Sequence, residues 1–216
     1  QRKFPDNFNI QFIKDQELRY GENPHQQAAF YIDQTHKGGY SQLAGKELSF
    51  NNIVDTDTAW ECVKGFNSPS CVIVKHANPC GVGIGHSPLL AYEKAYSTDP
   101  KSAFGGIIAL NSEIDATTAK AIIKQFVEVI VAPAFSAAAL DIIGEKKNLR
   151  ILQTSNLRNL NNYDLKKINN GILIQTKDDI SEKDLHEKMI IPTRIKPQEE
   201  DRIQLMFAWQ VAKFVK

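Results

Sequence analysis

The sequence is short of the features that mark special classes of protein. Its three cysteines, at positions 62, 71 and 80, form no CxxC pair, so neither a disulfide framework nor a zinc site is indicated. No apolar segment approaches the roughly 20 residues that a membrane-spanning helix needs. The formal net charge is +1 over 216 residues, which argues against broad, non-specific binding to nucleic acid. We therefore expect neither a membrane nor a nucleic-acid partner.

The amino terminus also lacks targeting signals. Residues 1–5 contain no initiator Met and begin no apolar segment of the kind found in secretory signals. We expect a cytoplasmic protein and a piece of a longer one. The composition, 42% apolar and 24% charged, is ordinary for a globular protein, and the length suits one large domain or two small ones.

The most informative stretch runs from Ser70 to Gly81. Its apolar part, Cys71–Val74, has no polar alternation and predicts a strand that is buried on both faces. The Pro and Gly residues between 78 and 85 predict that the strand stops and a loop follows. Because ligands of open α/β sheets bind outside the carboxyl ends of strands, Lys75 and His76 are candidate site residues.

Similar patterns repeat along the chain. Further strands are predicted at residues 7–13, 27–32, 104–110, 127–132, 149–152 and 172–174. Helices are predicted from Asp55 or Asp57 to Val63, at 89–97, 116–126 and 137–143, and from Pro197 onward. Strands that alternate with helices at this spacing indicate an α/β fold with a largely parallel sheet.

Five motifs occur together in a characteristic order. They are Leu18–Gln26 (LRYGENPHQ), Lys46–Asn52 (KELSFNN), Lys75–Gly81 (KHANPCG), Ser102–Gly106 (SAFGG) and Phe207–Trp209 (FAW). Together they resemble the AICAR transformylase part of the bifunctional purine-biosynthesis family, over roughly residues 15–215. Any one motif alone would be weak, but the coincidence of five is specific.

The resemblance implies a domain organisation. Residues 1–14 would be a linker from an absent amino-terminal IMP cyclohydrolase domain, and residues 15–196 a first cytidine-deaminase-like, layered α/β subdomain. Residues 197–216 would begin a helix that leads into an absent second subdomain. The resemblance also implies a homodimer of the complete protein, with active sites built across the subunit interface.

The implied reaction moves a formyl group from the co-substrate 10-formyltetrahydrofolate to the 5-amino group of AICAR. That amine is a poor nucleophile because its lone pair is delocalised. The transfer calls for a base at the amine and a donor at the tetrahedral oxyanion or the leaving nitrogen. His76 matches the family's proton acceptor and contacts AICAR, and Lys75 matches its transition-state stabiliser.

Four further residues match the family's AICAR-binding positions. Arg19 and Tyr20 match the nucleotide-binding pair, and an Arg fork suits the 5′-phosphate. Gly105, at the entry of a strand, would let the backbone approach the ligand closely. Glu128 matches a position where some members carry Asp, and either carboxylate could accept a hydrogen bond from the ribose or the base.

Simpler interpretations exist for these residues. Without the resemblance, a Lys-His pair after a strand is more often a solvated loop, and Arg19 would be a surface ion-pair residue. A dinucleotide loop at 81–85 fails because the third glycine of GxGxxG would fall on His86. The zinc deaminase signature of H-x-E and P-C-x-x-C is absent around His76 and Cys80, so we expect no zinc. An alternative function is a catalytically silent nucleotide-binding and dimerisation module.

Overall fold

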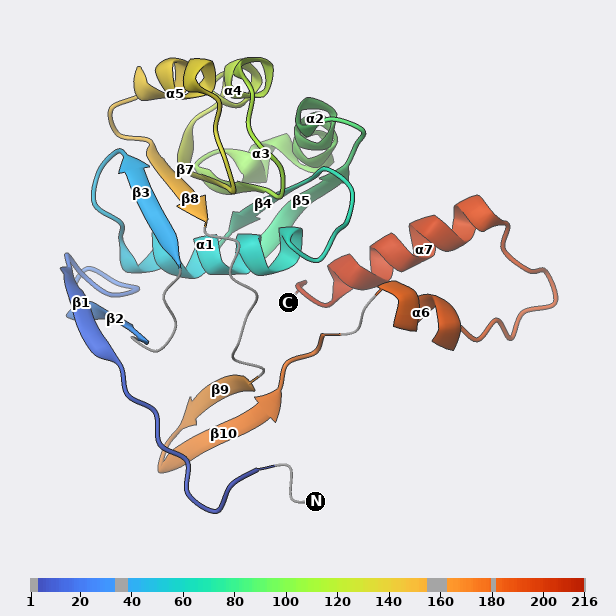
Figure 1. Cartoon of the computed structure of the whole chain (residues 1–216), viewed down its shortest axis with the longest axis horizontal. Helices are drawn as coiled ribbons and strands as arrows, with labels where there is room; N and C mark the ends of the chain where they lie inside the picture. The colour runs from blue at the N-terminus through green and yellow to red at the C-terminus, as the bar shows by residue number, and fades with distance from the viewer. Residues whose placement is uncertain (1–3, 34–38, 155–162, 180–181, 216) are drawn as a thin grey trace. The chain divides into compact units, whose positions relative to one another are not determined.

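The computed structural model describes residues 4–33, 39–154, 163–179 and 182–215. The chain divides into two compact units, residues 1–156 and 157–216 (Figure 1). The predicted domain boundaries after residues 14 and 196 stay predictions. Each unit is described by itself below.

The first unit is built on a six-stranded mixed sheet in the order β3-β8-β7-β6-β4-β5. Strands β6, β7 and β8 run parallel, β4 is antiparallel to both β5 and β6, and β3 is antiparallel to β8. The predicted α/β fold class is confirmed. The strands are Tyr40–Ala44 (β3), Ser70–Lys75 (β4), Asn78–Ile84 (β5), Gly106–Leu110 (β6), Val127–Ala132 (β7) and Arg150–Thr154 (β8).

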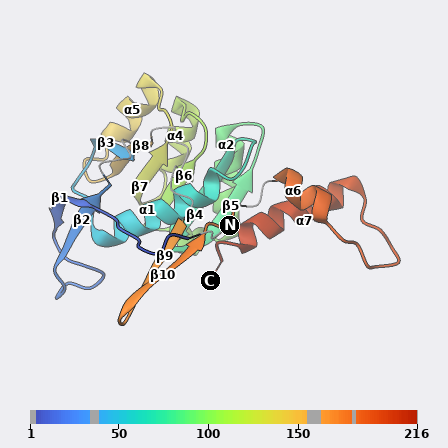
Figure 2. The same ribbon diagram turned by 60° about the horizontal axis from the view of Figure 1, so that its bottom comes forward.

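Helices cover both faces of this sheet (Figures 1 and 2). One face carries α1 (Phe50–Val63), and the other carries α2 (Pro88–Thr98), α4 (Ala116–Ile122) and α5 (Ala137–Gly144). The short α3 (Pro100–Ala103) precedes β6. Because the central strands are covered on both sides, they are apolar without alternation, as predicted. The face below α2, α4 and α5 holds a continuous core that includes Cys71, Ile73, Ile108, Ile130 and Ile143.

The predicted loop at 78–85 is wrong, because this segment forms β5, an edge strand that pairs with β4. Pro79 is tolerated there because it lies at a register shift on the outer strand of the sheet. Gly81 and Gly83 serve packing: a Cβ at Gly81 would lie 2.1 Å from the carbonyl oxygen of Ala95 in α2. The glycines allow α2 to pack closely against β5, and β5 continues through them.

Three other predictions need correction. Residues 7–12 are not a strand; β1 begins at Ile13, runs to Leu18 and pairs with β2 (Ala28–Ile32). Helix α1 begins at Phe50, before the predicted Asp55 or Asp57, because Ser49 and Asn52 form a capping box. Helix α4 ends at Ile122, four residues earlier than predicted, although its predicted Asp115 cap is present.

The second unit contains a hairpin and two helices. Strand β9 (Tyr163–Ile168) pairs antiparallel with β10 (Gly171–Thr176), and α6 (Glu182–Lys188) and α7 (Glu199–Ala212) follow. The predicted strand at 172–174 and the predicted acid-rich start of the last helix are confirmed. Strand β9 was not among the predicted strands.

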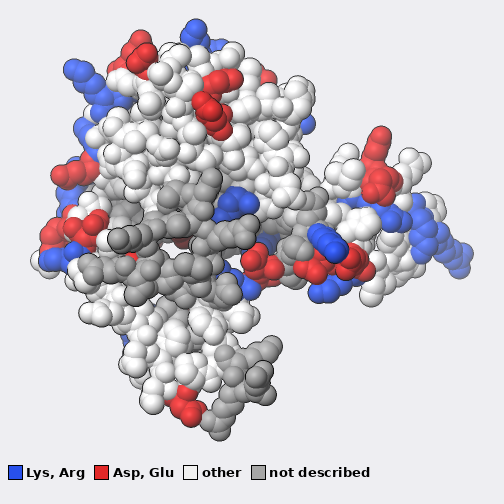
Figure 3. Space-filling model, in the orientation of Figure 1, with Lys and Arg blue, Asp and Glu red and all other residues white. Residues whose placement is uncertain are grey.

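The surface carries both signs of charge. Figure 3 shows both basic and acidic side chains on the visible face. Among the described residues, no helix is long and apolar enough to cross a membrane.

Candidate functional site

A cleft of about 860 Å³ lies beside the ends of strands β3, β7 and β8 and the start of α1. Its lining is cationic: six Lys or Arg residues face two Glu residues, which gives a local charge of 6 − 2 = +4. A concave, positively charged space of this size suits an anionic small molecule. The charged lining residues are Arg19, Lys46, Lys124, Lys146, Lys147, Arg150, Glu128 and Glu145.

Arg19 and Tyr20 enter this cleft from the segment that follows β1. Arg19 Nη2 donates to the Tyr20 hydroxyl at 3.0 Å, and the guanidinium carbon lies 4.8 Å from the centre of the Tyr20 ring. The tyrosine thus orients the guanidinium by a hydrogen bond and a cation–π contact. The rest of the LRYGENPHQ motif is a tight loop, in which the Gln26 side-chain oxygen accepts from the Asn23 backbone N–H at 2.7 Å.

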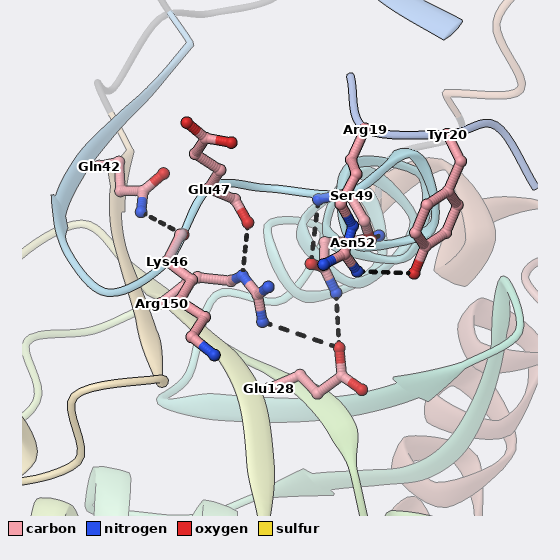
Figure 4. Close-up of polar contacts among 9 residues, drawn as sticks. All are labelled: Arg19, Tyr20, Gln42, Lys46, Glu47, Ser49, Asn52, Glu128 and Arg150. Carbon is pink, nitrogen blue, oxygen red and sulfur yellow. Dashed lines mark hydrogen bonds and ion pairs between the residues drawn. The ribbon is translucent and has the colours of Figure 1, made fainter. Parts of the chain in front are cut away.

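Glu128, at the start of β7, is held by two partners (Figure 4). Its Oε2 accepts from Asn52 Nδ2 at 2.8 Å and lies 3.9 Å from Arg150 Nη1. Asn52 is 4% exposed, and its own oxygen accepts from the Ser49 backbone N–H as part of the α1 cap. The Glu128 side chain remains 41% exposed, so the carboxylate is fixed in place and still accessible from the cleft.

Arg150 and the loop after β3 form the next part of the cleft lining. Arg150 is 15% exposed in its side chain and donates from Nε to the Glu47 carbonyl at 3.0 Å. Gly45 has a φ of +96°, and a Cβ there would lie 2.2 Å from the Leu149 carbonyl oxygen, so only glycine fits. The Gln42 amide donates to the carbonyls of residues 44–46, most closely to Lys46 at 2.7 Å. These contacts fix the position of the Lys46 backbone at the cleft.

Lys75 and His76 lie at the carboxyl end of β4, as the Pro and Gly pattern predicted. Lys75 Nζ donates to the Phe104 carbonyl at 2.8 Å. The neighbouring Gly105 has a φ of +72° and donates its N–H to the Phe126 carbonyl at 2.8 Å. Because Phe126 lines the cleft, this series of contacts connects the lysine to the rim of the cleft.

The six predicted site residues therefore fall into two groups. Arg19, Tyr20 and Glu128 line the cleft together, whereas Lys75, His76 and Gly105 are not among its lining residues. The two groups meet at Phe104 and Phe126, whose rings are 5.3 Å apart.

The site lies at an unexpected edge of the sheet for an open α/β fold. Glu128 and Arg150 stand where parallel strands β7 and β8 begin, and Gly105 precedes β6. Ligands of parallel sheets bind at the carboxyl edge. Lys75 reaches this amino edge because β4 is antiparallel to β6. Because β4 runs in the opposite direction, its carboxyl end lies at the same edge of the sheet as the amino ends of β6, β7 and β8.

Sequence reasoning missed several residues that shape the site. Asn52, Arg150 and Lys46 were not predicted, although Ser49-x-x-Asn52 has the spacing of a capping box. Asp55 was predicted as a helix cap, but it lies within α1 and accepts from backbone N–H groups of residues 76 and 77. Nothing local in the sequence signals that contact, because 21 residues separate the partners.

The cysteines of the described chain do not form a reactive cluster. Cys71 is fully buried, as expected for the strand at 71–74, and burial raises the pKa of its thiol above the ordinary value. Burial also raises the pKa of Cys80. Within the described residues, no group of three or more His, Cys, Asp or Glu side chains could hold a metal ion. The absence of zinc stays a prediction.

Comparison with known proteins gives one match over the whole chain. The family model described as the AICARFT/IMPCHase bienzyme matches residues 1–216. Solved structures match only in part. Acinetobacter baumannii RibD, form 1, aligns over 46% of this chain and 35% of that chain, at 17% identity and a TM-score of 0.38. The apo dCMP deaminase from cyanophage S-TIM5 aligns over 45% and 94%, at 13% identity and a TM-score of 0.35.

This chain spans about a third of the RibD chain that it matches. At these TM-scores the structural matches support no statement about function.

Proposed function

The chain belongs to the AICARFT/IMPCHase bienzyme family of purine biosynthesis, and from this membership we propose that it supplies part of the AICAR transformylase site. The reaction would transfer the formyl group of 10-formyltetrahydrofolate to the 5-amino group of AICAR. The observation that carries the proposal is the grouping of Arg19, Tyr20 and Glu128 around one cationic cleft of about 860 Å³. IMP cyclohydrolase would belong to another part of the complete protein.

In this proposal the cleft binds the nucleotide. The Arg19 guanidinium, oriented by Tyr20, binds the 5′-phosphate by charge-assisted hydrogen bonds. The Glu128 carboxylate, fixed by Asn52, accepts from a hydroxyl or amine of the ligand. Gly105 lets its backbone approach the nucleotide where a side chain would intrude.

The chemical step falls to His76 and Lys75. As the AICAR amine attacks the formyl carbon, the His76 imidazole takes the amine proton as general base. The tetrahedral oxyanion forms beside the Lys75 ammonium. That ammonium has three donors, of which the Phe104 carbonyl takes one. Collapse of the tetrahedral intermediate breaks the bond from carbon to the folate nitrogen, which takes up the proton held by the His76 imidazolium and leaves as tetrahydrofolate.

Two variants test these assignments. In the complete protein, His76→Ala should abolish formyl transfer and leave AICAR binding largely intact, whereas His86→Ala, at another exposed histidine, should behave as wild type. In calorimetric titration, Arg19→Ala should weaken AICAR binding strongly, with Arg194→Ala, an exposed arginine of the second unit, as the charge-matched control. Near-normal turnover in His76→Ala would rule out the proposed chemistry.

The alternative is a catalytically silent nucleotide-binding and dimerisation module. Exposed apolar side chains on α7 favour it, because Ile203 is 60% exposed and Trp209 is 67% exposed in this chain, and such groups commonly mark interaction surfaces. Formyl transfer measured with the 216-residue chain alone distinguishes the two functions. Turnover by this chain would reject the silent module.

A further inference from the structure

The turn that carries His76 has a backbone conformation that its residues disfavour. His76 and Ala77 have φ values of 55° and 54°, and they form the two-residue loop of the β4–β5 hairpin, since Lys75 pairs with Asn78. Such a loop needs positive φ at both positions, which is why Asn-Gly is its common sequence. Histidine adopts this region more readily than most residues, but alanine has no polar side chain to support it. The conformation therefore needs support from elsewhere.

The support comes from Asp55 in α1. Its Oδ1 accepts from the Ala77 backbone N–H at 2.6 Å, and its Oδ2 accepts from the His76 backbone N–H at 3.3 Å. One carboxylate thus receives both N–H groups of the turn. Hydrogen bonds of this charge-assisted kind are roughly twice as strong as neutral ones.

We propose that Asp55 is a positioning residue for formyl transfer, because its carboxylate holds the 76–77 turn in the left-handed conformation and so places the His76 imidazole relative to Lys75. Lys75 is fixed independently through the Phe104 carbonyl. The inference rests on the proposed function of His76. It adds a residue to the site that neither the sequence motifs nor the cleft contains.

The contacts specify how Asp55 acts. Both of its hydrogen bonds go to backbone N–H groups of the turn, so its effect on the imidazole passes through the backbone. Loss of the carboxylate should lower kcat through misplacement of the base, and an error of about 1 Å in such a group can cost roughly a hundredfold in rate. AICAR affinity should change little, because the cleft is lined by other residues.

The test uses the complete protein and four variants: Asp55→Ala, Asp55→Asn, the double variant Asp55→Ala/Ala77→Gly, and the control Asp141→Asn at an exposed acid of α5. We expect Asp55→Ala to lower kcat by tenfold to a hundredfold, with AICAR affinity within about fivefold of wild type. Glycine adopts positive φ without strain, so Ala77→Gly in the Asp55→Ala background should restore roughly tenfold of the rate. Asp55→Asn should fall between, since an amide oxygen can still accept one of the two bonds. The control should keep the wild-type rate.

A second readout is independent of activity. Hydrogen exchange at the Ala77 amide should be slow in wild type and faster in Asp55→Ala. A wild-type kcat in Asp55→Ala, unchanged protection of the Ala77 amide, or a lowered kcat that Ala77→Gly fails to restore would each overturn the inference. If Asp55→Ala does not fold, a wild-type rate and wild-type amide protection in Asp55→Asn would do the same. The proposed function is tested separately by His76→Ala, because turnover in that variant would overturn the chemistry whatever Asp55 does.

Discussion

Substitution of Asn52 tests the contact that joins the α1 cap to the cleft. The nearly buried amide caps the helix through its oxygen and holds Glu128 through its nitrogen. Asn52→Ala removes both contacts. Loss of a cap costs about 0.5–2 kcal/mol, and loss of a hydrogen bond to a charged group costs about 1.5–3 kcal/mol. Because Glu128 is 41% exposed, we take the lower end of the second range and expect a total of about 2–4 kcal/mol.

Asn52→Asp separates the two contacts. The aspartate keeps an oxygen that can accept from the Ser49 N–H, but it sets a second carboxylate against Glu128 at the 2.8 Å contact. Two adjacent carboxylates bind a shared proton more readily in the folded than in the unfolded variant. The stability of Asn52→Asp relative to wild type should therefore be lowest at neutral pH and rise as the pH falls. The stability of Asn52→Ala relative to wild type should change little over the same range.

Thermal unfolding followed by circular dichroism measures both effects. For a unit of this size, a loss of 2–4 kcal/mol corresponds to a fall in Tm of roughly 5–15 °C. Asn51→Ala is the matched control, since the exposed Asn51 amide makes one 3.3 Å bond to the Glu22 carbonyl, and it should change Tm by no more than a few degrees. A Tm of Asn52→Ala within about 2 °C of wild type, or a deficit of Asn52→Asp that does not depend on pH, would refute the reasoning.

Further predictions concern packing, acid stability and metal. Gly83→Ala should destabilise the first unit by at least about 2 kcal/mol in urea unfolding, because a Cβ there would lie 2.4 Å from the Ala91 carbonyl oxygen. Gly144→Ala is the control: a Cβ there would have nothing within 4 Å, so this variant should be neutral or stabilising. Equal effects of the two substitutions would contradict the packing argument. The Thr118 backbone N–H lowers the pKa of Asp115 from its ordinary value of 3.8. The Asp115 carboxylate therefore stabilises the fold above that pH, and this stabilisation is lost as the pH falls through the folded-state pKa. Asp115→Asn should keep the cap and remove this part of the acid dependence, as measurements of stability between pH 5 and about 2 would show. Elemental analysis of purified protein should find no stoichiometric zinc, and zinc bound near Cys80 would overturn the expectation.

Local patterns in the sequence predicted those elements whose cause is local. Buried strands at 71–74, 106–110 and 127–132 follow from apolar runs without alternation. The start of α2 follows from Pro88 at the first helical position, and the starts of α4 and α5 follow from the Asp115 and Ser136 caps. The predicted α1 starts too late because Asn51 and Asn52 were expected to precede the helix, whereas the contacts with Ser49 and Glu128 make a buried Asn52 amide acceptable within it.

The misassigned segment at 78–85 shows the limit of Pro and Gly signals. These residues indicate a break when the environment is unknown, but on an edge strand Pro79 lacks only a donor that the sheet does not need. The glycines were expected to mark the stop of a strand, whereas the backbone of α2 occupies the space where their side chains would be. That neighbour is contributed by residues 91–95, beyond the reach of a local pattern.

The sequence indicated which residues belong to the candidate site, but it only partly indicated how these residues are arranged in space. The family motifs indicated Arg19, Tyr20 and Glu128, and these line one cleft. The division between this group and Lys75 depends on the antiparallel course of β4, which no motif encodes. The supporting contacts from Asn52 and Asp55 depend on how α1 lies across the sheet.

Those two contacts make the first two turns of α1 a brace across the sheet. Asn52 fastens the helix to β7 and Asp55 fastens it to the β4–β5 turn, while β6 lies between the strands so connected. Adjacent strands of a sheet are rotated by about 20–25° relative to one another, and fluctuations in that rotation would otherwise change the distance from Glu128 to His76. The same helix thus holds both the Glu128 side chain and the turn of His76. In the proposed site, a ligand that immobilised Glu128 would therefore also restrict the turn of His76, and binding and catalysis would share one loss of motional entropy.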